Sequence, residues 1–235
     1  MLYFAHLPNM RKLFFSLFAA LSVANLSAIE MDSLLARMDA ASDSFQSMQA
    51  NVRWLKYTDL VDDESVEEGV IRVMRNKRQQ INLVIEFRDP YQYFFSVRGT
   101  KVEIYRPKIA TVEEYDLSKS REILEQALLL GFGTAGRFLR EKYELMMVGR
   151  EEVAETASIK IALVPKSQKL RGQMPRLEMW VSTSDWQPVQ EKIYGVNPGD
   201  YRLYTYTNIK RNLPMKGSTL KLKTPAGVKR VYPQR

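Results

Sequence analysis

The sequence contains no cysteine and only one histidine, His6, among its 235 residues. The absence of cysteine excludes a disulfide framework, a thiolate metal site, a cysteine nucleophile and an anchor on a lipidated N-terminal cysteine. His6 lies in a segment that we expect to be removed, so the mature chain would also lack a Ser-His-Asp triad and histidine ligands for zinc or haem. A packed apolar core must therefore stabilise the fold, and we predict no metal and no cofactor.

The first apolar run, Leu13 to Leu21, is too short to cross a membrane. It follows Arg11 and Lys12 and is followed by small residues, an order typical of an export signal. We predict a signal peptide over residues 1–28, and an uncleaved N-terminal anchor is the alternative. Two start codons and two cleavage positions fit this pattern, namely Met1 or Met10 and cleavage after Ala24 or Ala28.

The remaining chain, residues 29–235, has the composition of one ordinary globular domain. Of the whole sequence, 45% is hydrophobic and 26% is charged. Without Arg11 and Lys12, the 35 basic residues fall to 33 against 27 acidic ones, so the mature chain carries a net charge of +6. We therefore expect one exported domain, located in the periplasm.

The domain begins with a predicted helix from Asp32 to Met48. Apolar residues recur there every three or four positions and form one stripe, which another element must cover. They are Met31, Leu34, Leu35, Met38, Ala41, Phe45 and Met48.

Beyond this helix the apolar residues alternate with polar ones, a pattern that is typical of half-buried strands. Short turn signals between the runs favour antiparallel neighbours, and a sheet of this length is expected to curl. The predicted strands are Val52–Thr58, Val66–Arg75, Gln80–Phe87, Gln92–Arg98, Lys101–Tyr105, Thr111–Tyr115, Tyr143–Gly149, Ser158–Val164, Arg176–Val181, Val189–Tyr194 and Tyr201–Lys210.

A helical spacing interrupts the strands between Ser118 and Arg140 and breaks at Gly131-Phe132-Gly133. Gly131, Gly133 and Gly136 spell GxGxxG, but the residues before them are helical, whereas a dinucleotide fingerprint requires a buried strand there. We therefore interpret the glycines as a break between two helical pieces. Both helical regions can cover the concave face of a curled sheet.

Clusters of charged residues give weaker signals. Carboxylates gather at residues 62–68, 113–116 and 151–155, without the regular spacing of a calcium loop, so a hydrolase or a calcium site is disfavoured. Clusters of basic residues together with aromatics are also typical of nucleic-acid-binding surfaces. Export from the cytoplasm disfavours a DNA or RNA partner. Solvated strand faces account for most of these charges, and anionic lipid headgroups or an acidic client protein remain open as partners.

Arg75 differs from the other basic residues. On its predicted strand it shares a face with Ile71 and Val73, so its charge is aimed near the apolar concavity and would need a partner. A strand-end arginine turned to solvent is the alternative interpretation.

The order of these elements resembles the periplasmic outer-membrane lipoprotein carrier family (LolA-like, with LolB-type acceptors as relatives). The resemblance covers nearly the whole mature chain and rests on the order and spacing of short motifs. These are residues Phe45–Ala50, Glu68–Val73 running to Arg75, Asp89-Pro90, Val97–Pro107, and Leu220–Val228 as a closing strand.

The resemblance implies a mainly β fold in which a strongly curved antiparallel sheet of about 11 strands forms an unclosed β-barrel, with helices covering its concave face. It implies a monomeric, non-catalytic carrier that takes lipoprotein acyl chains from an inner-membrane transporter and passes them to an outer-membrane acceptor. Its site residues would be a lipid-binding wall, a lid and a latch, namely Ile71, Val73, Leu83, Ile85 and Phe95 for the wall, Leu128, Leu129 and Phe132 for the lid, and Arg75 for the latch. Another envelope lipid as cargo, or a sensor or scaffold on the same barrel, are the alternative functions.

Overall fold

The structure is a computed structural model, and it describes residues 30–120 and 131–233. The predicted signal peptide and the predicted lid residues Leu128 and Leu129 lie outside these ranges. The described elements are a helix over residues 30–44, followed by β1 (Ser47–Thr58), η1 (Asp59–Val61), β2 (Asp63–Arg75), β3 (Ile81–Asp89), β4 (Tyr93–Arg98), β5 (Lys101–Arg106), η2 (Pro107–Ile109), β6 (Thr111–Asp116), η3 (Ser118–Ser120), α3 (Gly136–Lys142), β7 (Tyr143–Val153), β8 (Thr156–Pro165), α4 (Gln168–Arg171), β9 (Leu177–Ser182), β10 (Pro188–Tyr194), β11 (Tyr201–Arg211), η4 (Gly217–Leu220) and β12 (Lys229–Val231).

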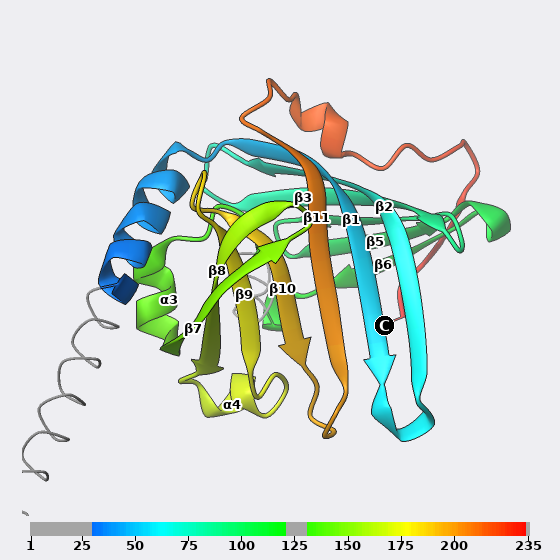
Figure 1. The fold of residues 1–235 in the computed structure, drawn as a ribbon. Coiled ribbons are helices and arrows are strands. Elements are labelled where there is room, and N and C mark those ends of the chain that lie inside the picture. Colours follow the sequence, from blue (N-terminus) through cyan, green and yellow to red (C-terminus); the bar gives the residue numbers. More distant parts are fainter. Residues whose placement is uncertain (1–29, 121–130, 234–235) are drawn as a thin grey trace, which may run out of the picture.

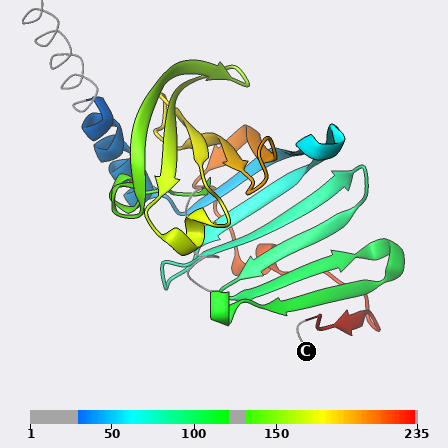
Figure 2. The same cartoon turned by 90° about the horizontal axis from the view of Figure 1, so that it is seen from below.

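These strands form one curved sheet (Figure 1), in the order β12-β6-β5-β4-β3-β2-β1-β11-β10-β9-β8-β7. Neighbouring strands are antiparallel except β12 and β6, which run parallel. Figure 2 shows strands β7–β9 turned steeply against β2–β6, so the sheet encloses a concave side. The edge strands β7 and β12 do not pair with each other, and the predicted unclosed barrel is confirmed.

All eleven predicted strands are present. The predicted ends differ most at β1, which begins at Ser47 rather than Val52, and at β7, which ends at Val153 rather than Gly149. Their alternating residues fall on two faces, and the register matches apolar partners across the concave face, such as Val73 with Leu83 and Leu83 with Val97. Burial of this face is what selects the register, because a slip of one residue would turn every apolar side chain outward.

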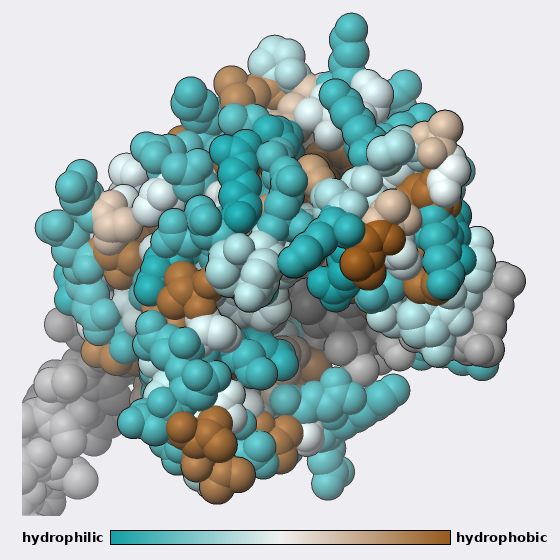
Figure 3. All heavy atoms as spheres, turned by 90° about the vertical axis from the view of Figure 1, so that its right-hand side faces the viewer, coloured by the Kyte–Doolittle hydropathy of each residue, from teal (hydrophilic) through white to brown (hydrophobic). Residues whose placement is uncertain are grey.

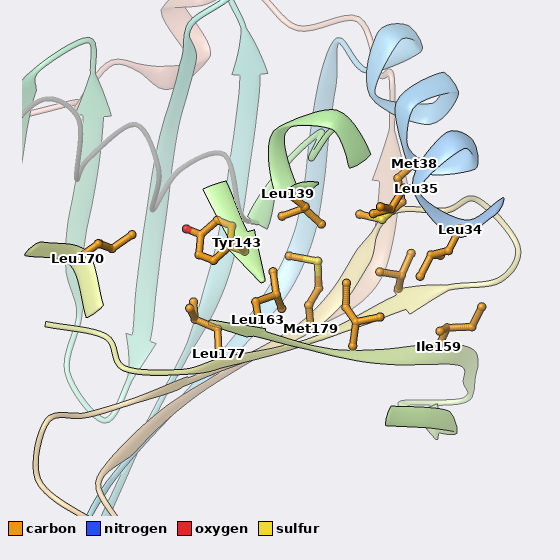
Figure 4. Close-up of a cluster of buried hydrophobic side chains, with 12 residues drawn as sticks. Leu34, Leu35, Met38, Leu139, Tyr143, Ile159, Leu163, Leu170, Leu177 and Met179 are labelled. Atoms are coloured by element: carbon orange, nitrogen blue, oxygen red, sulfur yellow. The ribbon is translucent and has the colours of Figure 1, made fainter. Parts of the chain in front are cut away.

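One end of the concave side is filled by a core that the helix over residues 30–44 completes. Leu34, Leu35 and Met38 are at most 3% exposed and pack on inward residues of β8 and β9, and Figure 4 shows these side chains facing one another. Gly136 of α3 packs directly on the helix: a Cβ there would lie 2.1 Å from the carbonyl oxygen of Leu35. The predicted covering of the sheet by the N-terminal helix is therefore confirmed.

A second core lies under the centre of the sheet, against β1 to β5. It contains Phe45 and Met48 as well as Phe132, which follows the second gap in the described chain.

Two predicted boundaries are wrong. The N-terminal helix ends at residue 44 rather than at Met48, because β1 begins at Ser47 and its pairing with β2 and β11 starts there. The closing strand lies at Lys229–Val231 rather than at Leu220–Val228, which runs as a 3-10 turn and loop across the sheet. The twelfth strand is the reason that the sheet exceeds the predicted eleven.

The face in Figure 3 is mostly hydrophilic, with apolar side chains in separate small patches. Within the described part of the chain, no helix combines the length and apolar character that a membrane crossing requires.

Candidate functional site

The residues predicted to form a lipid-binding wall lie together on the concave face, and their binding of lipid stays a prediction. Ile71 pairs with Ile85, and Ile85 pairs with Phe95, while Val73 pairs with Leu83. These side chains therefore lie side by side on adjacent strands. Ile71, Val73 and Leu83 are buried, whereas Ile85 and Phe95 are only half-buried.

The apolar wall continues on both sides of the predicted residues. Toward β6 it includes Ile104 and Tyr115, which are also half-buried. Toward β7 it includes Ile161, Leu163 and Met179, which the N-terminal helix covers. The wall therefore has a filled half and a half whose apolar side chains keep part of their surface accessible.

An aromatic row crosses this wall from β4 to β11. Tyr93 stacks on Phe87 at 4.6 Å between ring centroids, and Trp54 lies 5.9 Å from Phe87 and 5.6 Å from Tyr204. The hydroxyl of Tyr93 donates to a carboxyl oxygen of Glu67 at 2.5 Å, which fixes that end of the row. Flat rings of this kind offer a large contact area with few rotatable bonds.

Phe132, the one predicted lid residue within the described ranges, is 6% exposed and packs edge-on against Tyr206 at 5.5 Å. Gly133 next to it has φ +62°, a left-handed conformation that glycine adopts without strain. A Cβ at Gly133 would lie 2.6 Å from the ring of Phe45 and 2.8 Å from Nη2 of Arg75. The backbone at residue 133 is therefore held closely against both side chains.

Arg75, the predicted latch, joins three distant segments. Its Nη1 donates to the carbonyl oxygen of Ser42 at 2.8 Å, and its Nη2 donates to the carbonyl oxygen of Gly133 at 3.1 Å. The hydroxyl of Ser42 donates to the same Gly133 oxygen at 2.6 Å. The guanidinium also lies 5.5 Å from the centre of the Phe45 ring. The end of the N-terminal helix, the end of β2 and the segment after residue 130 therefore meet at this side chain.

The charge of Arg75 is balanced by carbonyl dipoles and a distant carboxylate. Burial lowers the pKa of Arg75, while the field of Asp43 raises it. Asp43 itself accepts a hydrogen bond from Arg137, which lowers the pKa of Asp43. The strand-end interpretation of Arg75, with its side chain turned to solvent, is not what the geometry gives.

The sequence analysis did not single out Glu191, which lies on the concave face between Met179 and Tyr204. Glu191 is 6% exposed, and among the described residues its Oε1 has no hydrogen-bond partner. Burial raises the pKa of Glu191 to about 8. The only sequence signal was that Glu191 lies two residues before Ile193, so that both side chains point to the same face of their strand.

One rim of the sheet carries exposed apolar residues at successive turns. The turns after β1, β3, β5 and β10 lie at one end of the sheet, because these four strands run in the same direction. Arg75 lies at the opposite end, because β2 runs antiparallel to β1 and ends at Arg75. We call this set the turn rim, and its exposed residues are Leu60 (92%), Val61 (67%), Tyr91 (72%), Ile109 (61%) and Val196 (66%).

Acidic or histidine side chains do not gather as a metal site in the described part of the chain, since no group of three lies close enough to hold an ion. The site is thus built from apolar and aromatic side chains with a few buried polar groups, a composition that suits binding of an apolar ligand.

Comparison with known proteins supports the fold. No family model matches the sequence, and no curated protein matches it significantly. Among solved structures, the chain is similar to MucB, with 12% identity, a TM-score of 0.54, and coverage of 83% of this chain and 63% of MucB. The chain thus spans less than two thirds of the MucB chain that it matches.

A conserved protein from Thermus thermophilus is similar to the same degree, with 14% identity, a TM-score of 0.53, and coverage of 86% of this chain and 98% of that one. A LolA superfamily protein from Nitrosomonas europaea is also found, with 12% identity, a TM-score of 0.42, and coverage of 81% and 97%. At such identities the likeness concerns the fold alone. At that level the curved, unclosed sheet expected from the resemblance is confirmed, and the chain shares its fold with MucB and with the Thermus thermophilus protein.

Proposed function

We propose that this protein is an exported, periplasmic carrier that binds the acyl chains of a lipoprotein on its concave face. It would receive them from an inner-membrane transporter and deliver them toward an outer-membrane acceptor. The observation that carries the proposal is the half-buried part of the apolar wall, formed by Ile85, Phe95, Ile104 and Tyr115. The curved, unclosed sheet with covering helices, which the family resemblance predicts, supports the carrier function.

The energetics suit a carrier that performs no catalysis. Burial of an acyl chain contributes about 0.8 kcal/mol per methylene group, so a 16-carbon chain gains about 12 kcal/mol when it is wholly removed from water. A half-exposed apolar wall supplies only part of that gain. Partial burial allows an acceptor with a deeper pocket to take the chain, which is what transfer requires.

The proposal is tested by measuring the affinity of the purified protein for a synthetic triacylated cysteinyl peptide. Phe95→Gln should weaken binding at least tenfold, because Phe95 lies on the concave wall. The matched control is Phe94→Gln: Phe94 is the next residue, is also half-buried, and stacks on Tyr105 at 5.9 Å on the outer face. Equal effects of the two substitutions, or no binding by the wild type, would remove the carrier function.

Cargo identity is settled by the lipids extracted from the natively purified protein. Acyl chains joined to peptide support the lipoprotein carrier, and free phospholipid or glycolipid supports a carrier of another lipid. The competing sensor or scaffold function predicts no bound acyl chains and a stable protein partner instead.

We further propose that Arg75 acts as a latch between the empty and loaded states. Its two hydrogen bonds reach the carbonyls of Ser42, in the N-terminal helix, and of Gly133, in the segment after residue 130, and cargo would replace them. Arg75→Leu should then leave lipid uptake intact and slow transfer to an acceptor, so that loaded protein accumulates. A transfer rate equal to that of the wild type in a normally folded variant would reduce Arg75 to a structural residue.

The turn rim is the surface where we place contact with donor and acceptor. Leu60 and Ile109 project from separate turns and are 92% and 61% exposed. Leu60→Glu and Ile109→Glu should leave the free energy of unfolding unchanged, because neither side chain is buried, and should slow transfer between partners. Unchanged transfer in both variants would assign partner contact to another surface.

A further inference from the structure

Three polar side chains from separate strands lie on the apolar concave side. They are Tyr143 at the start of β7, Glu191 on β10 and Tyr206 on β11, and each is at most 6% exposed. The hydroxyl of Tyr206 and both carboxyl oxygens of Glu191 lie within 3.6 Å of the point where a Cβ of residue 131 would sit, so these two side chains are close together. The charge of Glu191 also adds to burial in raising the pKa of Tyr143.

Two of these groups lack the hydrogen bonds that buried polar groups normally have. Among the described residues, Oε1 of Glu191 and the hydroxyl of Tyr143 have no partner. Each unpaired buried group costs about 1–3 kcal/mol. Two such groups in one place inside an apolar wall indicate a site that a ligand completes.

Because residue 131 is glycine, its backbone lies close to Glu191 and Tyr206, and we call this place of close approach the notch. The point where a Cβ of residue 131 would sit is 3.0 Å and 3.6 Å from the two carboxyl oxygens of Glu191, and 3.5 Å from the hydroxyl of Tyr206. Three oxygen atoms therefore surround one point that no side chain of residue 131 fills.

The chemistry of the notch depends on the ionisation of Glu191. The titratable groups that act on it are the hydroxyls of Tyr143, Tyr204 and Tyr206, and within the described ranges no basic side chain forms an ion pair with it. A buried carboxyl group without a cation keeps its proton, and its pKa of about 8 agrees with this. At neutral pH the carboxylic acid and the tyrosine hydroxyls can therefore all donate hydrogen bonds.

We propose that Glu191, Tyr206 and Tyr143 form a hydrogen-bonding site for the ester or amide carbonyl of an acyl chain bound on the concave face. Convergent donors match a carbonyl oxygen, which only accepts hydrogen bonds, and the surrounding apolar wall matches the hydrocarbon on either side. This inference rests on the proposed function, and it adds that the carrier recognises the linkage of the chain as well as its length.

The test compares two probes that differ only in the carbonyl group: 1-palmitoyl-lysophosphatidylglycerol and its 1-O-hexadecyl ether. The wild type should bind the ester about tenfold more tightly than the ether at pH 7. Glu191→Leu should bind the ether as well as the wild type does and lose the preference. Gly131→Ala should do the same by filling the notch, while Gln190→Leu, the neighbour on the opposite face, should keep the preference.

A pH series adds a readout that loss of shape would not give. Above pH 8 the preference of the wild type for the ester should fall, because the ionised Glu191 can no longer donate and its negative charge repels the carbonyl oxygen. Glu191→Gln keeps an amide donor and should retain a preference that does not change with pH.

Each outcome decides one proposal. If the wild type binds neither probe, the carrier function itself fails and this inference fails with it. If both probes bind equally to the wild type, or if Glu191→Leu and Gly131→Ala both keep the preference, the carbonyl site is wrong while the carrier function stands.

Discussion

The buried carboxyl group of Glu191 should make the stability of this protein fall as pH rises. In the unfolded chain its pKa is 4.5, and in the folded protein burial raises the pKa to about 8. Between these values the unfolded chain has released a proton that the folded protein still holds, so the free energy of unfolding falls by about 1.4 kcal/mol per pH unit. The stability is fully present below pH 4.5, and its loss levels off above pH 8 at a total of about 5 kcal/mol.

Glu191→Gln removes this titration at nearly constant shape. Urea unfolding of both proteins at pH 5, 7 and 9 should show the variant gaining stability relative to the wild type as pH rises, by about 4 kcal/mol between pH 5 and pH 9. The window is unusually clean, because the chain has no cysteine and its single histidine, His6, lies in the predicted signal peptide. A wild-type pH slope that persists in the variant would refute the assignment of a buried, protonated Glu191.

Three further predictions concern the packing around the site. Gly133→Ala and Gly99→Ala both place alanine at φ +62°, but only the Cβ at residue 133 has neighbours within 4 Å. Thermal unfolding should therefore show a loss of stability of about 1 kcal/mol for Gly99→Ala and at least 1–2 kcal/mol more for Gly133→Ala. Equal losses would contradict the close packing at Gly133. Met38→Asp buries an unpaired charge at a 0% exposed position and should lower stability by several kcal/mol. Ala36→Asp, on the exposed side of the same helix, should change stability by less than about 0.5 kcal/mol. Similar losses would contradict the assignment of buried and exposed faces to this helix. Arg230→Ala removes the ion pairs that hold β12 to β5 and β6 and should speed tryptic cleavage after Lys229, the site in β12 that the substitution leaves intact. Unchanged cleavage there would show that the pairing of β12 does not depend on these ion pairs.

The alternation of apolar residues was sufficient to predict eleven strands. Most of these strands are half-buried, and burial of one face is what makes a period of two visible. The exception is β9, in which all six residues are buried. The choice of Ile71, Val73, Leu83, Ile85 and Phe95 as a lipid-binding wall came from the family resemblance, and their binding of lipid stays a prediction. Arg75 was predicted as a latch from its place on the same strand face as Ile71 and Val73 and from the family resemblance, and this role stays a prediction. Its acceptors at Ser42 and Gly133 could not be predicted, because the packing of distant segments brings them together.

Glu191 was missed for a physical reason. The register between β9 and β10 shifts between Pro188 and Gln190, so periodicity alone did not fix which face of β10 is concave. A charged residue in such a strand is normally assigned to solvent.

The strand β12 was misplaced for a different reason. It pairs over only three residues, and two of them, Lys229 and Arg230, are charged. Ion pairs from Arg230 to Glu103 and Glu114 hold it to the sheet, and a hydrophobic pattern carries no trace of such contacts.

The strand order has a consequence for how the chain folds. β1, the first strand to be made, lies at the centre of the sheet and pairs with β11, nearly the last, for example through Val52 and Tyr206. Closing so long a loop is slow, and until β11 arrives β1 keeps one edge unpaired. A chain released before β11 would therefore expose open edges on both β1 and β10, where other chains can add as strands. Productive folding thus depends on keeping the first half of the molecule from associating until the second half has emerged.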